Sequence, residues 1–303
     1  MSPANSTPTR EGVRDGLAEH GYLADRGLST VVSISLALGK PLLLEGEAGV
    51  GKTELAKTLA QMLGARLIRL QCYEGIDVAH ALYDWNYARQ MLYIRTLEAS
   101  DAAGDHTLDD LFGREFLIRR PLLDAIEHTD EVPPVLLIDE IDRADDEFEA
   151  FLLELLSDFQ VTIPEIGTIR AERRPIAVVT SNRTRELHDA LKRRCLYHWI
   201  DHPTPEREIE IIHARIEGLP DRLAGEAAAF VARLRTLELV KAPGVAETLD
   251  WVESLITLEQ VELAPEPVDA TLGAVVKYHE DLGRVRAAGV ETLVAAARRD
   301  AGE

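Results

Sequence analysis

Cysteine is nearly missing from this chain of 303 residues, which carries only Cys72 and Cys195. Two isolated cysteines cannot build the disulfide framework of a small secreted domain, and they lack the paired spacing of a zinc site. Such low usage suits a reducing compartment. We therefore expect a cytoplasmic protein.

Long apolar runs are also missing. No stretch reaches the 18 or so apolar residues that a membrane-spanning helix needs, so we expect no membrane span. Residues 1–10 contain Ser, Thr and Pro but no apolar centre, and they do not resemble a signal peptide.

Basic residues are few relative to acidic ones. The chain has 33 Lys and Arg against 53 Asp and Glu, which gives a formal net charge of −20. A field of this sign repels phosphate, and it disfavours nucleic acid and anionic membranes as general partners. It does not exclude ATP, because a phosphate-binding loop creates its own local anion site. The length suggests two domains, or one large unit with an appendage.

The strongest motif is an octet that fits the P-loop pattern of Gly, four free positions, Gly, Lys, and Ser or Thr. The octet is Gly46-Glu47-Ala48-Gly49-Val50-Gly51-Lys52-Thr53. It follows an apolar run at 41–45 that predicts a buried strand, and it precedes a predicted helix at 54–64. Strand, glycine-rich loop and helix in this order are the context that the motif requires.

The chemistry of the octet follows from its residue types. Glycines allow backbone N–H groups to approach phosphate closely, and a helix N-terminus adds a partial positive charge. Lys52 would reach the β- and γ-phosphates, and the hydroxyl of Thr53 would ligate Mg²⁺. The alternative is an ordinary glycine-rich turn before a helix.

A second motif is the aliphatic run 135–138, which ends in Asp139 and Glu140. Such a run predicts a strand buried on both faces, as in a parallel sheet, and open α/β sheets bind ligands at strand carboxyl ends. Asp139 would hold Mg²⁺, and Glu140 would polarise the attacking water. The alternative is a strand that simply ends at the acidic start of a helix.

The remaining pattern up to residue 203 alternates helices and strands. Residues 1–18 suggest a loose polar tail. Tyr22 precedes the first strand and could pack on a nucleotide base, although a buried tyrosine with no ligand role is an equal alternative. We expect helices at 28–38, 76–82, 87–99, 121–128, 145–160 and 186–192, strands at 65–71, 175–180 and 195–200, a hairpin at 161–170, and an acidic loop at 101–105.

Beyond a proline-rich boundary at 203–205 the pattern is helical, with no core strand. We expect helices at 205–217, 221–237, 245–259, 267–279 and 285–299. The predicted fold is therefore α/β, a parallel sheet flanked by helices, followed by a small all-α domain.

With both motifs in place, the chain resembles an AAA+ ATPase of the MoxR family. The octet at 46–53 resembles Walker A, and residues 135–140 resemble Walker B. Residues 180–182 stand in the sensor 1 place, and 190–195 stand where AAA+ proteins carry the arginine finger. Two stretches, 82–87 and 241–251, resemble a MoxR branch found beside carbon monoxide dehydrogenase genes.

The resemblance implies a residue-by-residue site for ATP and Mg²⁺. Asn182 would be sensor 1, Arg194 is the first candidate for the finger, and Arg193 is the second; the bland alternative is a solvated basic pair. The residue pattern and the resemblance together lead us to expect a flexible tail at 1–18, an AAA+ core at 19–203 with a helix-2 insert and a hairpin before sensor 1, and a lid at 204–303.

As partners, the resemblance implies a homo-oligomeric ring, typically a hexamer, a protein with a von Willebrand A domain, and a client protein. The implied function is an ATP-hydrolysing chaperone that remodels or matures a partner, for example a metalloenzyme. The alternative is a nucleotide-gated scaffold with little turnover, because residues 241–246 lack the expected sensor 2 arginine and offer only Lys241. A kinase or GTPase is less favoured, since no Asn-Lys-x-Asp guanine motif is present.

Overall fold

The structure is a computed structural model, and it describes residues 8–99 and 111–302. The predicted acidic loop at 101–105 lies outside these residues. The contacts divide the chain into two compact units. Unit 1 comprises residues up to Gly16, Asp25–Glu45 and Ala56–His198, and unit 2 comprises Leu17–Ala24, Gly46–Leu55 and Trp199–Glu303. The predicted domain limits at 19–203 and 204–303 stay a prediction.

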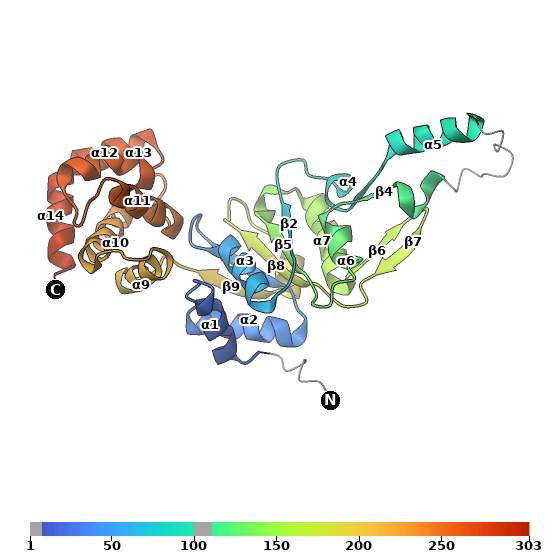
Figure 1. Cartoon of the computed structure of the whole chain (residues 1–303), viewed down its shortest axis with the longest axis horizontal. Helices are drawn as coiled ribbons and strands as arrows, with labels where there is room; N and C mark the ends of the chain where they lie inside the picture. Colours follow the sequence, from blue (N-terminus) through green and yellow to red (C-terminus); the bar gives the residue numbers. More distant parts are fainter. Residues whose placement is uncertain (1–7, 100–110, 303) are drawn as a thin grey trace. The chain divides into compact units, whose positions relative to one another are not determined.

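A five-stranded sheet organises the first part of the chain, in the order β2-β5-β8-β1-β9 (Figure 1). Pairing is parallel between β2 and β5, between β5 and β8, and between β8 and β1. The carboxyl ends of these strands therefore share one edge. The strands are β1 (Leu42–Gly46), β2 (Leu67–Gln71), β5 (Val135–Asp139), β8 (Ile176–Ser181) and β9 (Leu196–Ile200).

Aliphatic side chains bury both faces of the central strands, as the apolar runs predict. All five residues of β5 are buried. Leu136 and Ile138 join a core cluster with Leu122 of α6 (Pro121–Ile126) and Leu152 of α7 (Asp146–Asp158). Leu137, which points to the other face by strand alternation, is equally buried. The α/β prediction, a parallel sheet flanked by helices, is confirmed.

The N-terminal helices differ from the prediction at one point. Helix α2 (Arg26–Leu38) begins after the N-cap Asp25, and α3 (Lys52–Leu63) begins within the octet, at Lys52, both near their predicted places. The expectation that residues 1–18 form a loose tail is wrong for α1 (Arg10–Glu19). Val13 and Leu17 are both fully buried, and their spacing of four places them on one helical face.

The insert after β2 contains helix α5 (Tyr87–Ala99) at its predicted place, while α4 (Val78–Ala81) is shorter than expected. It also contains an unpredicted antiparallel pair of strands, β3 (Tyr83–Trp85) and β4 (Leu117–Arg119). Strand β4 directly follows the 3₁₀ turn Arg114–Phe116. Strands of three residues are too short to show alternation. An edge contact between the rings of Trp85 and Phe112, 5.3 Å between centroids, helps to hold the insert together.

The hairpin prediction is confirmed by β6 (Gln160–Ile163) and β7 (Gly167–Arg170). Helix α8 (Asp189–Arg194) begins three residues later than predicted. The reason is that Glu149 accepts a hydrogen bond from the His188 backbone N–H at 2.9 Å, and Arg185 donates to the Ala144 carbonyl. These contacts hold the preceding residues outside the helix.

Six helices follow β9, and no strand occurs among the described residues after 200 (Figure 1). Phe230 and Trp251 pack at 5.1 Å in their core. The single helix expected at 285–299 is wrong, because Gly289 with φ of 85° separates two helices. The six are α9 (Pro205–Arg215), α10 (Asp221–Thr236), α11 (Val245–Thr257), α12 (Pro265–Val275), α13 (His279–Ala288) and α14 (Val290–Asp300). They form the predicted all-α lid.

Across the described residues, none of the helices combines the length and the apolar character that crossing a membrane would require.

Candidate functional site

Asp139 closes β5 as a nearly buried carboxylate, with 2% of its surface exposed. The hydroxyl of Thr180 on β8 donates to it at 2.6 Å. Arg69 on β2 donates through Nε at 3.0 Å and forms an ion pair through Nη2 at 2.6 Å. Two neighbouring strands therefore fix the carboxylate and balance its charge, as a buried ion requires.

Glu140 lies just beyond the end of the strand and is more open, since 32% of its side chain is exposed. Its φ of 56° and ψ of 50° place it in the left-handed region, which is uncommon for a residue with a side chain. Its carboxylate accepts from Gln71 at 3.1 Å and pairs with Arg143 at 2.9 Å. The amide of Asn182 lies 3.4 Å from the other oxygen. A carboxylate held at an open strand end can take a proton from water.

Asp142 links the residues that follow β8 to the strand end that carries Asp139 and Glu140. It lies in the 3₁₀ turn Ile141–Arg143 and accepts from the Asn182 N–H at 3.1 Å and from the Thr184 hydroxyl at 2.7 Å. Burial alone would raise the pKa of Asp142, but the hydrogen bonds from Thr184 and Asn182 outweigh burial and lower it. Asp142 is therefore an anchor that positions Asn182.

The octet itself belongs to unit 2. Gly46 is required by a close approach, because a Cβ there would lie 2.4 Å from the Ile200 carbonyl oxygen. The ammonium of Lys52 donates to the carbonyl oxygens of Gly46 at 2.8 Å and Glu47 at 2.6 Å. The loop backbone thus surrounds the head of its own lysine, and the expectation that Lys52 reaches the β- and γ-phosphates stays a prediction.

Tyr22 lies beside this loop. A Cβ added to Gly51 would stand 3.5 Å from the Tyr22 ring, an ordinary van der Waals contact, so the ring packs against the loop. Glycine is favoured at this position by its φ of 99°. The sequence prediction that Tyr22 belongs to the nucleotide site is compatible with this position, and its role stays a prediction. Thr53, half-buried in the first turn of α3, offers a hydroxyl oxygen.

The two finger candidates lie elsewhere. Arg193 and Arg194 are exposed in the last turn of α8, inside the helix rather than after it. Arg194 donates to the hydroxyl of Ser157 on α7. Neither arginine bonds to Glu140 in the part of the chain that the structure describes.

Sequence reasoning missed Arg69, Gln71 and Arg143 as partners of the carboxylates, and it did not separate the role of Thr180 from that of Asn182. Part of the signal was present. Arg69 and Gln71 are two residues apart on a strand and therefore share a face. With β2 paired in parallel to β5, Gln71 lies opposite Asp139. What the sequence could not supply was the order of the strands.

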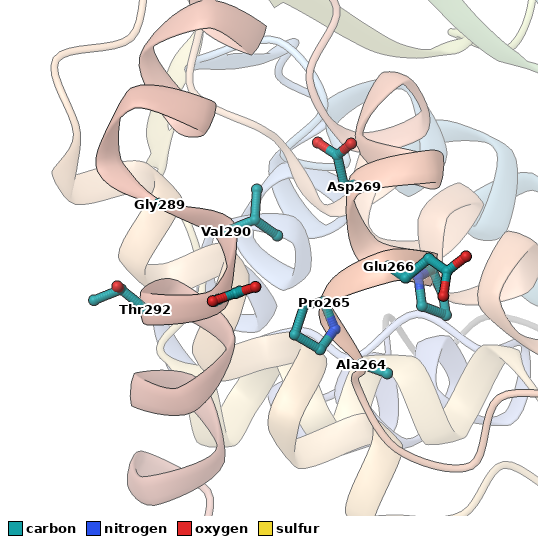
Figure 2. Close-up of a pocket in the computed structure, with 9 residues that line it drawn as sticks. Ala264, Pro265, Glu266, Asp269, Gly289, Val290 and Thr292 are labelled. Carbon is teal, nitrogen blue, oxygen red and sulfur yellow. The ribbon is translucent and has the colours of Figure 1, made fainter.

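An open depression of about 800 Å³ lies in the lid where α12 and α14 begin (Figure 2). Glu266, Asp269 and Glu291 line it, and no lysine or arginine does. Their negative charges have the same sign as a phosphate and repel it, so we do not assign the nucleotide to this depression.

No curated protein matches the chain. Among solved structures, it is similar to domain III of the replication initiation protein DnaA from Thermotoga maritima, with 14% identity, a TM-score of 0.48, and coverage of 91% of this chain and 100% of that one. The AAA domain family, dynein-related subfamily, matches residues 41–195, about half of the chain, including the octet, the carboxylates and Asn182. The chain therefore belongs to the AAA domain family.

Proposed function

We propose that this protein binds ATP with Mg²⁺ and hydrolyses it to ADP and phosphate. One observation carries the proposal. At the end of β5, the buried, charge-balanced Asp139 stands directly before the more open Glu140. One carboxylate oxygen of Glu140 pairs with Arg143, and the second faces the amide of Asn182. The two neighbouring carboxylates thus have different environments, which suits one for a metal and the other for a proton.

The roles follow from these environments. Glu140 would orient the attacking water and accept its proton, and Asn182 would hold the water or the terminal phosphate by its amide. Lys52 and the N–H groups of residues 46–53 would bind the phosphates. The Thr53 hydroxyl and the Asp139 carboxylate are hard oxygen donors of the kind that Mg²⁺ takes, and they would hold it. The metal would supply charge neutralisation at the phosphates.

Arg194, with Arg193 second, would act in a neighbouring subunit of a homo-oligomeric ring. Their exposure at the end of α8, with no bond from either to Glu140 among the described residues, supports a role in trans. A finger of this kind contributes about 10³ to 10⁵ in rate. We propose both the ring and its size, a hexamer.

More specifically, we propose that the protein is a MoxR-like chaperone. It would remodel a client, for example a metalloenzyme, together with a von Willebrand A domain partner. The insert supports a client surface, because Tyr87, Met91 and Leu92 on α5 are 63%, 54% and 65% exposed. The alternative, a nucleotide-gated scaffold with little turnover, is favoured by residues 241–246, which contain no arginine.

The test is steady-state phosphate release by the purified protein with Mg²⁺ and ATP. Glu140→Gln should lower the rate by about 10²- to 10⁴-fold, the usual contribution of a general base. Glu147→Gln is the matched control, because Glu147 is an exposed glutamate in the first turn of α7. Equal rates for the unaltered protein and Glu140→Gln would remove Glu140 from the mechanism. No release by the unaltered protein would favour the scaffold.

A further inference from the structure

The lid touches the phosphate-binding loop through backbone atoms within unit 2. The carbonyl oxygen of Gly49 accepts from the N–H of Val245 at 2.9 Å and from that of Ala246 at 3.3 Å. These are the first two N–H groups of α11, which lack partners inside their own helix. The start of a lid helix is therefore capped by the P-loop.

Two glycines make this contact possible. A Cβ on Gly244 would lie 2.7 Å from the Gly49 Cα and 2.8 Å from the Ala48 carbonyl oxygen, and neither backbone atom can move aside easily. A Cβ on Gly49 would lie 2.5 Å from a carboxylate oxygen of Glu247. That carboxylate accepts from the Gly244 N–H at 3.1 Å and so closes the turn into α11.

Buried carboxylates of the lid hold the segment that leads into α11. Asp281, fully buried on α13, accepts from the N–H groups of Val240 at 2.7 Å and Lys241 at 3.1 Å. Arg235 donates to the Pro243 carbonyl at 2.8 Å and also pairs with the fully buried Glu208. The position of the α11 N-terminus is thus a property of the lid core.

The contact has a consequence for the phosphate cradle. The peptide between Gly49 and Val50 is trans and planar, so its N–H points away from its carbonyl. When α11 holds the Gly49 carbonyl outward, the Val50 N–H must turn toward the opposite side of the loop. In a P-loop, that side is where backbone N–H groups meet phosphate.

We propose that the N-terminus of α11 is the lid's phosphate sensor: it sets the Gly49 peptide for phosphate binding, in place of a sensor 2 arginine. Val245 and Gly244 are positioning residues, since they act through the loop and need not touch the nucleotide. The inference rests on the proposed function, because it assumes that residues 46–53 bind the phosphates of ATP. It implies reciprocal coupling, in which bound phosphate also favours the docked lid.

The first test is Val245→Pro. Proline is well tolerated at the first position of a helix but has no N–H to donate to Gly49. The extended Gly244, with φ of −86° and ψ of −179°, suits a residue before proline. The matched control is His279→Pro, at the exposed first position of α13. Binding of ADP and of adenosine is measured by calorimetry and competition.

We expect Val245→Pro to weaken ADP binding by about tenfold, as the loss of a hydrogen bond and its pre-organisation implies, with adenosine unaffected. His279→Pro should match the unaltered protein. Unchanged ADP binding in Val245→Pro would overturn the inference and leave the proposed function standing. An equal loss for ADP and adenosine would also overturn it, as general damage. No ADP binding by the unaltered protein would overturn the proposed function, and the sensor with it.

A second pair of variants guards against misfolding. Gly244→Ala places its Cβ against the P-loop backbone, whereas Gly273→Ala in α12 meets no atom within 4 Å. Gly244→Ala should show the same selective loss for ADP with unchanged helix content by circular dichroism, and Gly273→Ala should show none. Tight ADP binding by Gly244→Ala would contradict a close contact between α11 and Gly49.

Discussion

Asp142 shows how one buried side chain can organise several backbone groups. It is 2% exposed, and it accepts bonds from the residues that follow β8. Asp142→Asn would leave one N–H or hydroxyl facing an amide nitrogen that cannot accept. We expect it to lower the free energy of unfolding by about 1–3 kcal/mol, measured by urea denaturation at pH 7.

The same residue predicts a pH dependence. Because its hydrogen bonds, outweighing burial, lower the pKa of Asp142 in the folded state, its contribution is present above the unfolded pKa of about 4. The contribution is lost as the pH falls through the lower folded value. The stability of Asp142→Asn should therefore decline less steeply than that of the unaltered protein below pH 4. Parallel curves would show that Asp142 does not drive the acid response.

The thiols give a second prediction at this scale. Burial raises the pKa of Cys72 to about 12, with a further rise from nearby carboxylates, Asp139 foremost, and burial raises that of Cys195 to about 12 as well. Since the thiolate is the reactive form, neither cysteine of the native protein should react with iodoacetamide at pH 8. Mass spectrometry should show labelling of both only in denaturant. Rapid native labelling of Cys72 would contradict its burial in the structure, whereas Cys195 is half-buried.

At the scale of elements, α1 is structural rather than a tail. Leu17 is fully buried, while Leu38, the last residue of α2, is 59% exposed. Leu17→Ala should destabilise the protein by about 2–5 kcal/mol, the usual cost of a buried leucine, and Leu38→Ala by less than about 0.5 kcal/mol. Thermal unfolding compares the two. Equal destabilisation by the two substitutions would indicate that α1 is the loose tail that its composition suggests.

The insert helix α5 yields a prediction about partners. Changing its exposed Tyr87, Met91 and Leu92 to serine should leave the melting temperature nearly unchanged, because exposed side chains add little stability. In a Glu140→Gln background, the same changes should reduce capture of a client in the presence of ATP. Undiminished capture would show that the client does not bind at α5.

The sequence predicted the elements whose signal is local. The octet specifies its own loop, and the aliphatic runs before Asp139 and at 175–180 could only be buried strands. Elements that depend on distant contacts were missed. Strand β3 exists because it pairs with β4 more than 30 residues later along the chain, and the start of α8 depends on Glu149 binding the His188 N–H.

The same distinction applies to the site. Asp139, Glu140, Lys52 and Thr53 are named by their motifs, whereas Arg69 and Gln71 become visible only when β2 is paired with β5. The contact of α11 with Gly49 joins residues almost 200 positions apart, and no periodicity marks it.

At the scale of the whole molecule, the central question is whether sites are shared between subunits. If Arg194 is the finger, Arg194→Ala should lose about 10³-fold or more in turnover. Mixing it with Glu140→Gln should restore part of the activity, because one subunit then supplies the intact site and its neighbour the intact arginine. Phosphate release by the mixture, compared with each variant alone, is the measurement. A mixture as inactive as its components would place the finger elsewhere.

The claim that Glu140 drives hydrolysis of ATP held at residues 46–53 is tested most directly by the identity of the bound nucleotide. Each protein is mixed in excess with Mg²⁺ and ATP for one turnover, and the bound nucleotide is then separated by chromatography. The account predicts ADP on the unaltered protein and on Glu147→Gln, and intact ATP on Glu140→Gln. ADP on Glu140→Gln at the same rate, or no nucleotide on any of the three, would contradict it.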